Sequence, residues 1–577
     1  METPLKIVLA AVHLEEGPDA VPLGAASVAS ALKAAFPGKL AITLAEAFVS
    51  QGPQVLAARI KAADNARETL QLKSALQIAA AGFSVYSWNR TVMIEAAQIL
   101  RTENPGIFLF CGGPEATALP AGLARSEGGP FDAVIAGKGE VAAVELLGRR
   151  FFGAPPEAAA PDQALDALPP VESEDEGAAN GLAGLPSPWL DGTLEARGRE
   201  GVLWELARGC PYSCTYCYES GGFAESGGFA ASGTEKRVRY FPEERIREEL
   251  RVFVRAQVPY VFVLDPTFNS NNKRALGILR MIREETRQNK GPPTHWHFEV
   301  RGELLTREQA RSFAALGASL QIGLQTADSK VAALIGRSFN KGLFASRIGL
   351  LNEEGTIFGL DLIYGLPGDS LDGYRRSLDF ALSLYPNSLD MFRLAVLPGT
   401  ALFDKAAEYG LASDRDAPYT VRSTPGFPGE DLDKAAALSH AADLFYNRGR
   451  AVAWFNQALR PLRIKPSAFL AGFGGFAGSD VAGKGIEEAQ LAWLEQSYRR
   501  AKKEPVLPAL RDLVRFHGAW GRALAEGAAA DIAFSYHPDE VLGEQALDLE
   551  AFAASARPRS VRVRVRPGSK GPELEWG

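Results

Sequence analysis

Cysteine and histidine are scarce in this chain. Its 577 residues include four cysteines and six histidines. So few thiols exclude a disulfide framework as the main source of stability in a chain of this length. Three of the four cysteines, Cys210, Cys214 and Cys217, nevertheless fall within one short segment. Clustered thiols in a protein without a disulfide framework indicate a metal or redox site.

Long apolar runs and a strong excess of one charge are also missing. No apolar stretch approaches the roughly 20 residues that span a bilayer, and the first residues lack the small-residue cleavage site of a secretory signal. The formal net charge is −7, from 62 basic and 69 acidic residues, which argues against a general nucleic-acid-binding surface. We therefore expect a cytoplasmic protein that binds neither membrane nor nucleic acid.

Strand and helix patterns alternate over residues 1–153. Apolar strand patterns begin at Lys6, Leu40, Ala80, Ile107 and Asp132. Helical patterns lie between several of them, and this alternation predicts a parallel, doubly wound α/β domain of the Rossmann-like type. Residues 154–198 are rich in Ala, Pro, Gly and acidic residues, a composition that predicts an interdomain linker, partly disordered.

Residues 199–410 return to the alternation, with six strand patterns. Six strand–helix units over about 200 residues favour a partial (β/α)6 barrel over the closed eight-stranded form. Residues 411–577 carry mostly helical patterns and end in a short β-like tail, so we expect a helical C-terminal domain. The alternating segment Ser560–Arg566 predicts a strand with one charged, solvated face. No pattern in the C-terminal domain indicates its function.

The three clustered cysteines follow the first barrel strand with the spacing Cys-x3-Cys-x2-Cys. Three thiolates leave one iron of a four-iron cubane without a protein ligand, and a catalytic metal site needs such an open position. A structural zinc site takes four closed ligands, and no fourth Cys or His lies near the motif. An iron–sulfur site is therefore predicted, whereas the isolated Cys111 is expected to pack in a core.

With Tyr216 before the last cysteine, this motif resembles that of the radical S-adenosylmethionine (SAM) superfamily. The resemblance implies a [4Fe–4S] cluster on Cys210, Cys214 and Cys217 whose open iron binds SAM. It also implies cleavage of SAM to methionine and a 5′-deoxyadenosyl radical, with reduced flavodoxin or ferredoxin as the electron donor. The sequence holds no second cysteine group for an auxiliary cluster.

Polar residues follow the barrel strands in an order that resembles the SAM-contacting strands of oxygen-independent coproporphyrinogen oxidase. A zwitterion and a ribose diol need a cation, acids and an amide at the mouth of the strands. Taken singly, such a residue is more often a solvated or capping one, but the joint order favours a SAM site. By this resemblance the SAM contacts are Tyr216, Asp265, Asn269, Glu299, Gln325, Arg337, Asp361 and Gly365.

The N-terminal domain resembles the cobalamin-binding domain that precedes many radical SAM barrels. The resemblance rests on Gly24, Ser84-Val-Tyr86, Gly112-Gly113-Pro-Glu115 and Gly137-Lys-Gly139-Glu140. It implies that Gly112, Gly113, Gly137 and Gly139 let the backbone approach a corrin or its nucleotide tail. The Asp-x-His-x-x-Gly loop that supplies a cobalt ligand in many cobalamin proteins is missing, and His13 is expected to be a loop histidine. A degenerate domain that binds nothing is the alternative.

Together the resemblances imply a cobalamin-dependent radical SAM methyltransferase that acts on an unactivated carbon. A cyclase or rearrangement enzyme with the same cofactors is the alternative. A SAM- or cobalamin-sensing module is the non-enzyme alternative, and the complete cysteine motif argues against it. Methylthiolation would need further N-terminal cysteines, which the sequence lacks. Neither the substrate nor any catalytic residue beyond the cofactor sites is indicated.

Overall fold

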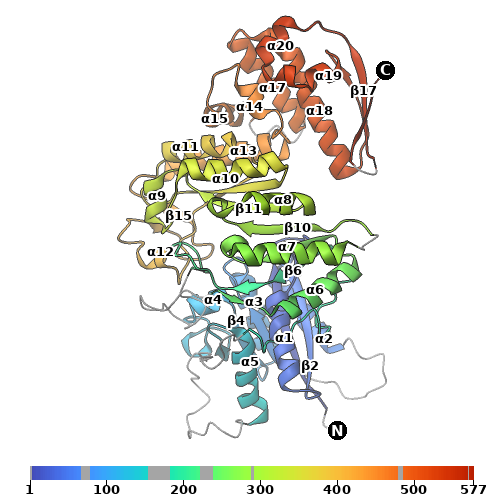
Figure 1. Ribbon diagram of the computed structural model, residues 1–577. Coiled ribbons are helices and arrows are strands. Elements are labelled where there is room, and N and C mark those ends of the chain that lie inside the picture. The colour runs from blue at the N-terminus through green and yellow to red at the C-terminus, as the bar shows by residue number, and fades with distance from the viewer. Residues whose placement is uncertain are drawn as a thin grey trace. The chain divides into compact units, whose positions relative to one another are not determined.

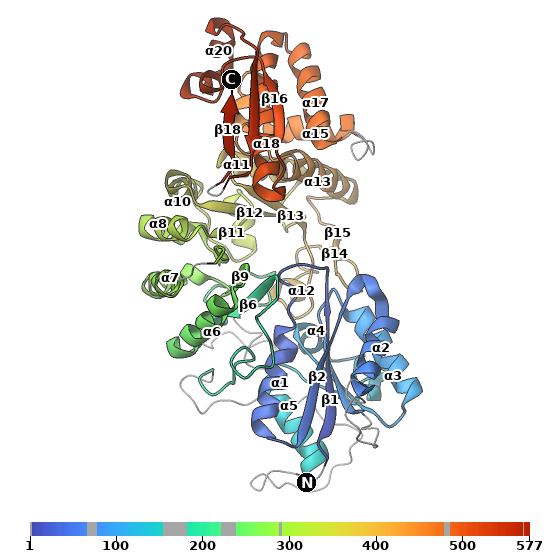
Figure 2. The ribbon, with the colours of Figure 1, turned by 90° about the vertical axis from the view of Figure 1, so that its right-hand side faces the viewer.

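The computed structural model describes residues 3–65, 78–153, 182–220, 238–287, 291–477, 485–568 and 571–576. The chain forms two compact units, whose elements are labelled in Figures 1 and 2. Unit 1 comprises Met1–Leu320, Ile335–Arg337 and Ala395–Val421. Unit 2 comprises Gln321–Leu334, Ser338–Leu394 and Arg422–Gly577.

A five-stranded parallel sheet opens unit 1, in the order β2-β1-β3-β4-β5. Its strands are β1 (Leu5–His13), β2 (Leu40–Phe48), β3 (Ile78–Ser84), β4 (Phe108–Gly112) and β5 (Ala133–Val134). The centre of β1 is buried on both faces, as the apolar run starting at Lys6 predicts. The last strand is much shorter than its sequence pattern suggests, because the chain leaves the sheet ahead of the turn at Gly137.

Helices cover both faces of this sheet (Figure 2), which confirms the doubly wound prediction. The helices are α1 (Leu23–Ala35), α2 (Gly52–Asn65), α3 (Arg90–Glu103) and α5 (Gly139–Leu147). Apolar residues of α1 and α5 pack on one face of the sheet, and those of α2 and α3 pack on the other. The sequence patterns above omit α2, whose buried apolar side is limited to Leu56, Ala57 and Ile60.

Unit 1 continues with the first part of the predicted barrel. Strand β6 pairs in parallel with β9, and β9 pairs in parallel with β10. The strands are β6 (Gly201–Glu205), β9 (Tyr260–Leu264) and β10 (His295–Val300), with helices α6 (Glu243–Ala256), α7 (Asn272–Thr286) and α8 (Arg307–Leu316). Alternate strand residues such as Trp204 and Phe298 are buried, the former against Phe253 of α6. The fourth strand, β11 (Ser319–Gln325), begins in unit 1 and ends in unit 2.

The predicted linker divides into two parts. Residues 154–181 lie outside the described residues. Residues 182–198 form no helix or strand, but they are fixed to the barrel of unit 1. The buried Trp189 donates a hydrogen bond to the carbonyl of Leu203 at 3.2 Å, and Ser187 donates one to Glu249 at 2.5 Å.

Unit 2 contains the remaining barrel strands and the C-terminal helices. Strands β12 (Ile357–Tyr364) and β13 (Ser388–Arg393) pair in parallel, so all six predicted barrel strands exist. Helices α13 (Gly429–Ala442), α15 (Pro466–Ala477), α17 (Ile486–Arg500) and α18 (Leu507–Glu526) follow. The chain ends in an antiparallel sheet of β16 (Ala530–Phe534), β17 (Val561–Arg566) and β18 (Glu573–Trp576).

The alternation in β17 is as predicted, with buried valines and exposed arginines. Two of these arginines pair with acidic residues of the neighbouring strands, Arg564 with Asp531 and Arg566 with Glu573. The basic segment is therefore one solvated face of a small sheet. Among the described residues, no helix is long and apolar enough to cross a membrane.

We predict that Gly82→Ala destabilises the N-terminal sheet. A methyl group at Gly82, in the centre of β3, would collide with the ring of Phe110 and come within 2.7 Å of Leu9. Overpacking of a filled core costs roughly 1–3 kcal/mol, so the thermal unfolding midpoint should fall. Gly277→Ala is the matched control, because Gly277 lies in α7 with open space around it and Ala favours a helix. A midpoint unchanged in Gly82→Ala would contradict the packing described here.

Candidate cluster and cofactor site

The three cysteines lie in one loop, which follows the short strand β7 (Ala207–Arg208). Cys214 is buried, and Cys210 and Cys217 are partly buried. Hydrogen bonds within the loop hold the second half of the motif. The amide of Cys217 donates to the carbonyl of Cys214 at 3.2 Å, and the Ser220 hydroxyl contacts the carbonyls of Cys214 and Cys217 at 2.6 and 2.7 Å.

Two distant segments of unit 1 also hold this loop. The amide of Thr215 donates to the carbonyl of Ile335 at 3.1 Å, and the amide of Leu402 donates to the carbonyl of Thr215 at 2.8 Å. Gly336 has a φ of 73°, and a side chain there would collide with the carbonyl of Ser213. The cluster loop is therefore shaped by residues more than a hundred positions further along the chain.

The donor set of the loop fits an iron–sulfur cluster. It offers three thiols, those of Cys210, Cys214 and Cys217, whereas a structural zinc site takes four ligands. A cubane spreads its thiolates over separate irons, so its ligands need not converge on one point. Burial, with smaller effects from Cys214 and Cys210, raises the pKa of Cys217 to about 12. Bound iron would therefore have to displace the thiol protons.

Two arginines contact the tyrosines that alternate with the cysteines. The guanidinium of Arg301 lies 3.8 Å over the ring of Tyr212, and Arg337 hydrogen-bonds to Tyr216. Both arginines face Glu303 of the turn η5 (Gly302–Leu304), at 2.6 Å for Arg301 and 3.9 Å for Arg337. Burial opposes the charge of Arg337, but Tyr216, Cys214 and Glu303 outweigh it and raise its pKa. Sequence reasoning missed Arg301 and Glu303, although they follow directly on β10.

The other predicted SAM contacts in unit 1 are Asp265, Asn269 and Glu299. Asp265 is buried and accepts a hydrogen bond from Arg274 at 2.9 Å. Asn269 is also buried, and its amide exchanges two hydrogen bonds of 2.9 Å with the backbone of Arg301. Glu299 is exposed near the end of β10. Asp265 and Asn269 thus brace the loops around the site, and the role of all three toward SAM stays a prediction.

Unit 2 carries the predicted contacts Gln325, Asp361 and Gly365. Gln325 ends β11 with a positive φ of 65°, and its buried Oε1 has no hydrogen-bond partner among the described residues. A strained backbone with an unpaired buried oxygen is typical of a binding position. Asp361, on β12, accepts a hydrogen bond from Gln321, which also donates to Asp390 at 2.8 Å. Gly365 directly follows β12.

In the N-terminal sheet, the strand order reverses between β1 and β3. In open α/β sheets a ligand binds at the carboxyl ends of the strands beside such a switch point. The loop after β3 places Tyr86 and Trp88 there, with stacked rings whose centroids are 4.4 Å apart. Trp88 is 47% exposed. Sequence reasoning used Tyr86 only within a resemblance and gave Trp88 no role, although an exposed aromatic ring at a switch point suits a flat, apolar ligand.

The four predicted glycines lie at the same edge of the sheet, and packing within the chain accounts for two of them. A side chain would come within 2.6 Å of the Val85 carbonyl at Gly113 and within 3.1 Å of Val28 at Gly139, whereas at Gly112 it would make only an ordinary contact with Ile135 at 3.5 Å. Gly137 has a φ of 81° and no atom within 4 Å of that position, so its surface is open to a ligand. Cobalamin contacts at these positions stay predictions.

His13 is the last residue of β1 rather than a residue of the loop that follows. Its Nε2 lies 3.0 Å from Oε2 of Glu46, on the neighbouring strand β2. The imidazole is largely buried and is held by this contact.

Ion pairs tie the N-terminal sheet to the cluster loop within unit 1. Arg208 contacts Glu140 of α5 at 2.7 Å and Glu205 of β6 at 2.8 Å. Burial raises the pKa of Glu140, but the charge of Arg208 outweighs it and lowers the pKa overall. The fully buried Glu115 contacts Arg90 at 3.1 Å and accepts a hydrogen bond from Tyr419.

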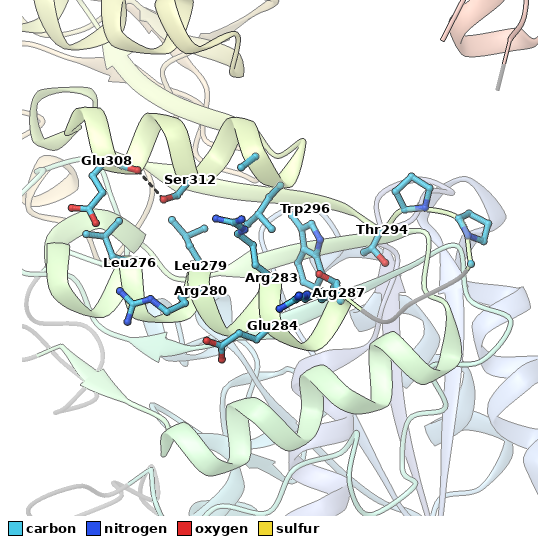
Figure 3. A pocket seen from close by; sticks show the side chains of 16 residues that line it. Leu276, Leu279, Arg280, Arg283, Glu284, Arg287, Thr294, Trp296, Glu308 and Ser312 are labelled. Atoms are coloured by element: carbon cyan, nitrogen blue, oxygen red, sulfur yellow. Dashed lines mark hydrogen bonds between the residues drawn. The ribbon is translucent and has the colours of Figure 1, made fainter. Parts of the chain in front are cut away.

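A cleft of about 730 Å³ lies on the helical side of the barrel in unit 1, between α7 and α8 (Figure 3). Arg280 and Arg283 of α7 and Glu308 of α8 line it, together with the buried Trp296. None of its lining residues belongs to the cluster loop. The candidate site is therefore defined by the cysteines and their neighbours and not by this cleft.

Two known domains match the chain. Residues 10–147 match the B12 binding domain, and residues 204–381 match the radical SAM superfamily. The chain thus contains a radical SAM domain, which follows a B12 binding domain. The fold and the cofactor classes predicted from the sequence are confirmed by these matches: a [4Fe–4S] cluster, SAM and cobalamin.

Two curated relatives are methyltransferases. The cobalamin-dependent radical SAM methyltransferase TokK of Streptomyces tokunonensis is 28% identical, over 65% of this chain and 56% of that protein. The 2-(S-pantetheinyl)-carbapenam-3-carboxylate methyltransferase of Streptantibioticus cattleyicolor is 25% identical, over the same shares. The chain thus spans little more than half the length of these relatives.

A solved structure shares the fold. The radical SAM methyltransferase TsrM of Kitasatospora setae, bound to tryptophan and a SAM analogue, has a TM-score of 0.55 to this chain and 15% identity. The match covers 87% of this chain and 99% of TsrM.

We predict that cluster binding requires Cys210, Cys214 and Cys217 but not Cys111. Cys111 is fully buried in the core of the N-terminal sheet, whereas the other three share the loop. After anaerobic reconstitution, the parent chain and Cys111→Ser should bind about four irons, and Cys→Ala at any loop position should lose them. Iron and sulfide assays with electron paramagnetic resonance measure this. Loss of the cluster in Cys111→Ser, with the fold intact by circular dichroism, would refute the assignment.

Proposed function

We propose that this chain is a cobalamin-dependent radical SAM methyltransferase that methylates an unactivated carbon. The observation that carries the proposal is the link between the cysteine loop and the B12 binding domain. Arg208 stands two residues before Cys210 and is paired with Glu140 at 2.7 Å. This contact supports an arrangement in which radical generation and methyl donation occur side by side. The printed activities of both curated relatives support methyl transfer.

Residues of unit 1 suit the binding of each cofactor. Cys210, Cys214 and Cys217 would hold the [4Fe–4S] cluster, and Arg337, beside Tyr216, is suited to the carboxylate of SAM. The stacked pair of Tyr86 and Trp88 would face cobalamin at the switch point. When bound, the cluster and SAM would supply a 5′-deoxyadenosyl radical for hydrogen abstraction. Cobalamin would supply a methyl group for the carbon that loses the hydrogen. Reduced flavodoxin or ferredoxin is the proposed electron donor.

The first test follows the fate of SAM. Full-length protein, reconstituted with iron, sulfide and hydroxocobalamin and given SAM and dithionite, should form both 5′-deoxyadenosine and S-adenosylhomocysteine. Cys214→Ala should lose the 5′-deoxyadenosine but keep its cobalamin, because the B12 binding domain is a separate sheet. Mass spectrometry measures the products of SAM, and the absorption spectrum of the protein measures the bound cobalamin.

Labelled SAM separates methyl transfer from the alternative chemistry. Metabolites from cells lacking the gene are incubated with the enzyme and SAM that carries a deuterated methyl group. A metabolite that gains the deuterated methyl supports the proposal. A metabolite that only loses hydrogens identifies a cyclase or rearrangement enzyme instead. A parent protein that retains no cobalamin would contradict the proposal and favour a degenerate domain.

We further predict that cobalamin binds without a protein histidine on cobalt. His13 is the one histidine in residues 1–153, and its Nε2 is engaged by Glu46. A weak or absent lower ligand makes cobalt easier to reduce, since axial ligands tune metal potentials. In the Co(II) state the paramagnetic resonance spectrum should be base-off, without nitrogen splitting, and His13→Ala should not change it. Nitrogen splitting that disappears in His13→Ala would show that His13 is the ligand.

A further inference from the structure

Glu303 joins the two arginines that contact the cluster loop. Its Oε1 lies 2.6 Å from Arg301 and 3.9 Å from Arg337. Its Oε2 is buried and has no hydrogen-bond partner among the described residues. One partly buried carboxylate therefore faces two guanidinium groups, of the buried Arg301 and the partly buried Arg337. The three side chains together carry a single positive charge.

Each arginine reaches a different gap of the cysteine motif. Arg301 covers the ring of Tyr212, between Cys210 and Cys214. Arg337 hydrogen-bonds to Tyr216, between Cys214 and Cys217. Arg301 thus acts electrostatically on Cys210 and Arg337 on Cys214.

We propose that Glu303 is a positioning residue that keeps the reduction potential of the cluster low. This inference rests on the proposed function, because it requires the [4Fe–4S] cluster. Adding an electron makes the cluster and its three thiolates more negative, and a nearby fixed negative charge opposes that step. Glu303 also offsets half of the positive charge of Arg301 and Arg337, which would otherwise favour reduction.

The direction in which the reduction potential of the cluster changes distinguishes this electrostatic role from a role in packing. Removing the carboxylate should raise the potential, and removing one guanidinium should lower it. A purely structural disturbance of the loop would not give opposite shifts. Arg301 suits the second change because Asn269 holds its backbone with two hydrogen bonds that do not involve its side chain.

The experiment is a redox titration of the reconstituted full-length protein, monitored by electron paramagnetic resonance of the reduced cluster. Glu303→Gln should have a more positive potential than the parent, Glu303→Asp a potential close to the parent, and Arg301→Gln a more negative one. Glu308→Gln is the matched control, because Glu308 lines the cleft of Figure 3 on α8 and should leave the potential unchanged.

The outcomes are distinct. An unchanged potential in Glu303→Gln that holds four irons per chain would overturn the proposal, as would shifts of the same sign in Glu303→Gln and Arg301→Gln. If Glu303→Gln loses iron, the test rests on the reduction potential of Arg301→Gln. A potential that is not lower than that of the parent protein overturns the proposal. Loss of iron from both variants would also overturn it and leave Glu303 a residue of loop folding. A parent chain that binds no iron would contradict the proposed function itself.

Discussion

The guanidinium of Arg208 connects the N-terminal sheet of unit 1 to the first barrel strand. It contacts Glu140 at the start of α5 and Glu205 at the end of β6, and the cysteine motif begins two residues later. Removing one partner of a buried ion pair typically costs about 3–5 kcal/mol, because the remaining charge stays buried and unpaired. The position of the B12 binding domain and the start of the cluster loop are therefore not independent. The other contacts of the site add to the arrangement that these two ion pairs hold in place.

A second group of contacts comes from residues 395–421, which follow the barrel strands in sequence. Leu402 bonds the backbone of Thr215 inside the cluster loop. Tyr419 donates to the buried carboxylate of Glu115, beside Arg90 of the B12 binding domain. One segment thus contacts both the loop that carries the cysteines and the domain expected to carry cobalamin. A radical and its methyl donor have to be held near one another, and these contacts fit that requirement.

The sequence predicted those parts of the site whose signal is local. Cysteine spacing identified the loop, and the alternation of strands and helices predicted both sheets, since each follows from neighbouring residues. Glu303 gave no such signal, because a carboxylate after a strand is indistinguishable from a solvated residue until Arg301 and Arg337 are seen beside it. The partners of Asp265 and Asn269 were equally hidden. Their place after β9 predicts SAM contacts, but only the structure shows that their side chains also bond Arg274 and the backbone of Arg301.

The division of the chain into units also bears on how the protein is made. Unit 1 is interrupted after Leu320 and again after Arg337, and its last segment ends at Val421. A nascent chain that has just released the last cysteine from the ribosome still lacks Ile335, Leu402 and Tyr419, which shape the loop or its surroundings. Because a chain emerges from its N-terminus, the thiols exist for some time without the backbone that orders them. The contacts that hold the cluster loop are therefore complete only after the chain has been synthesised as far as Val421.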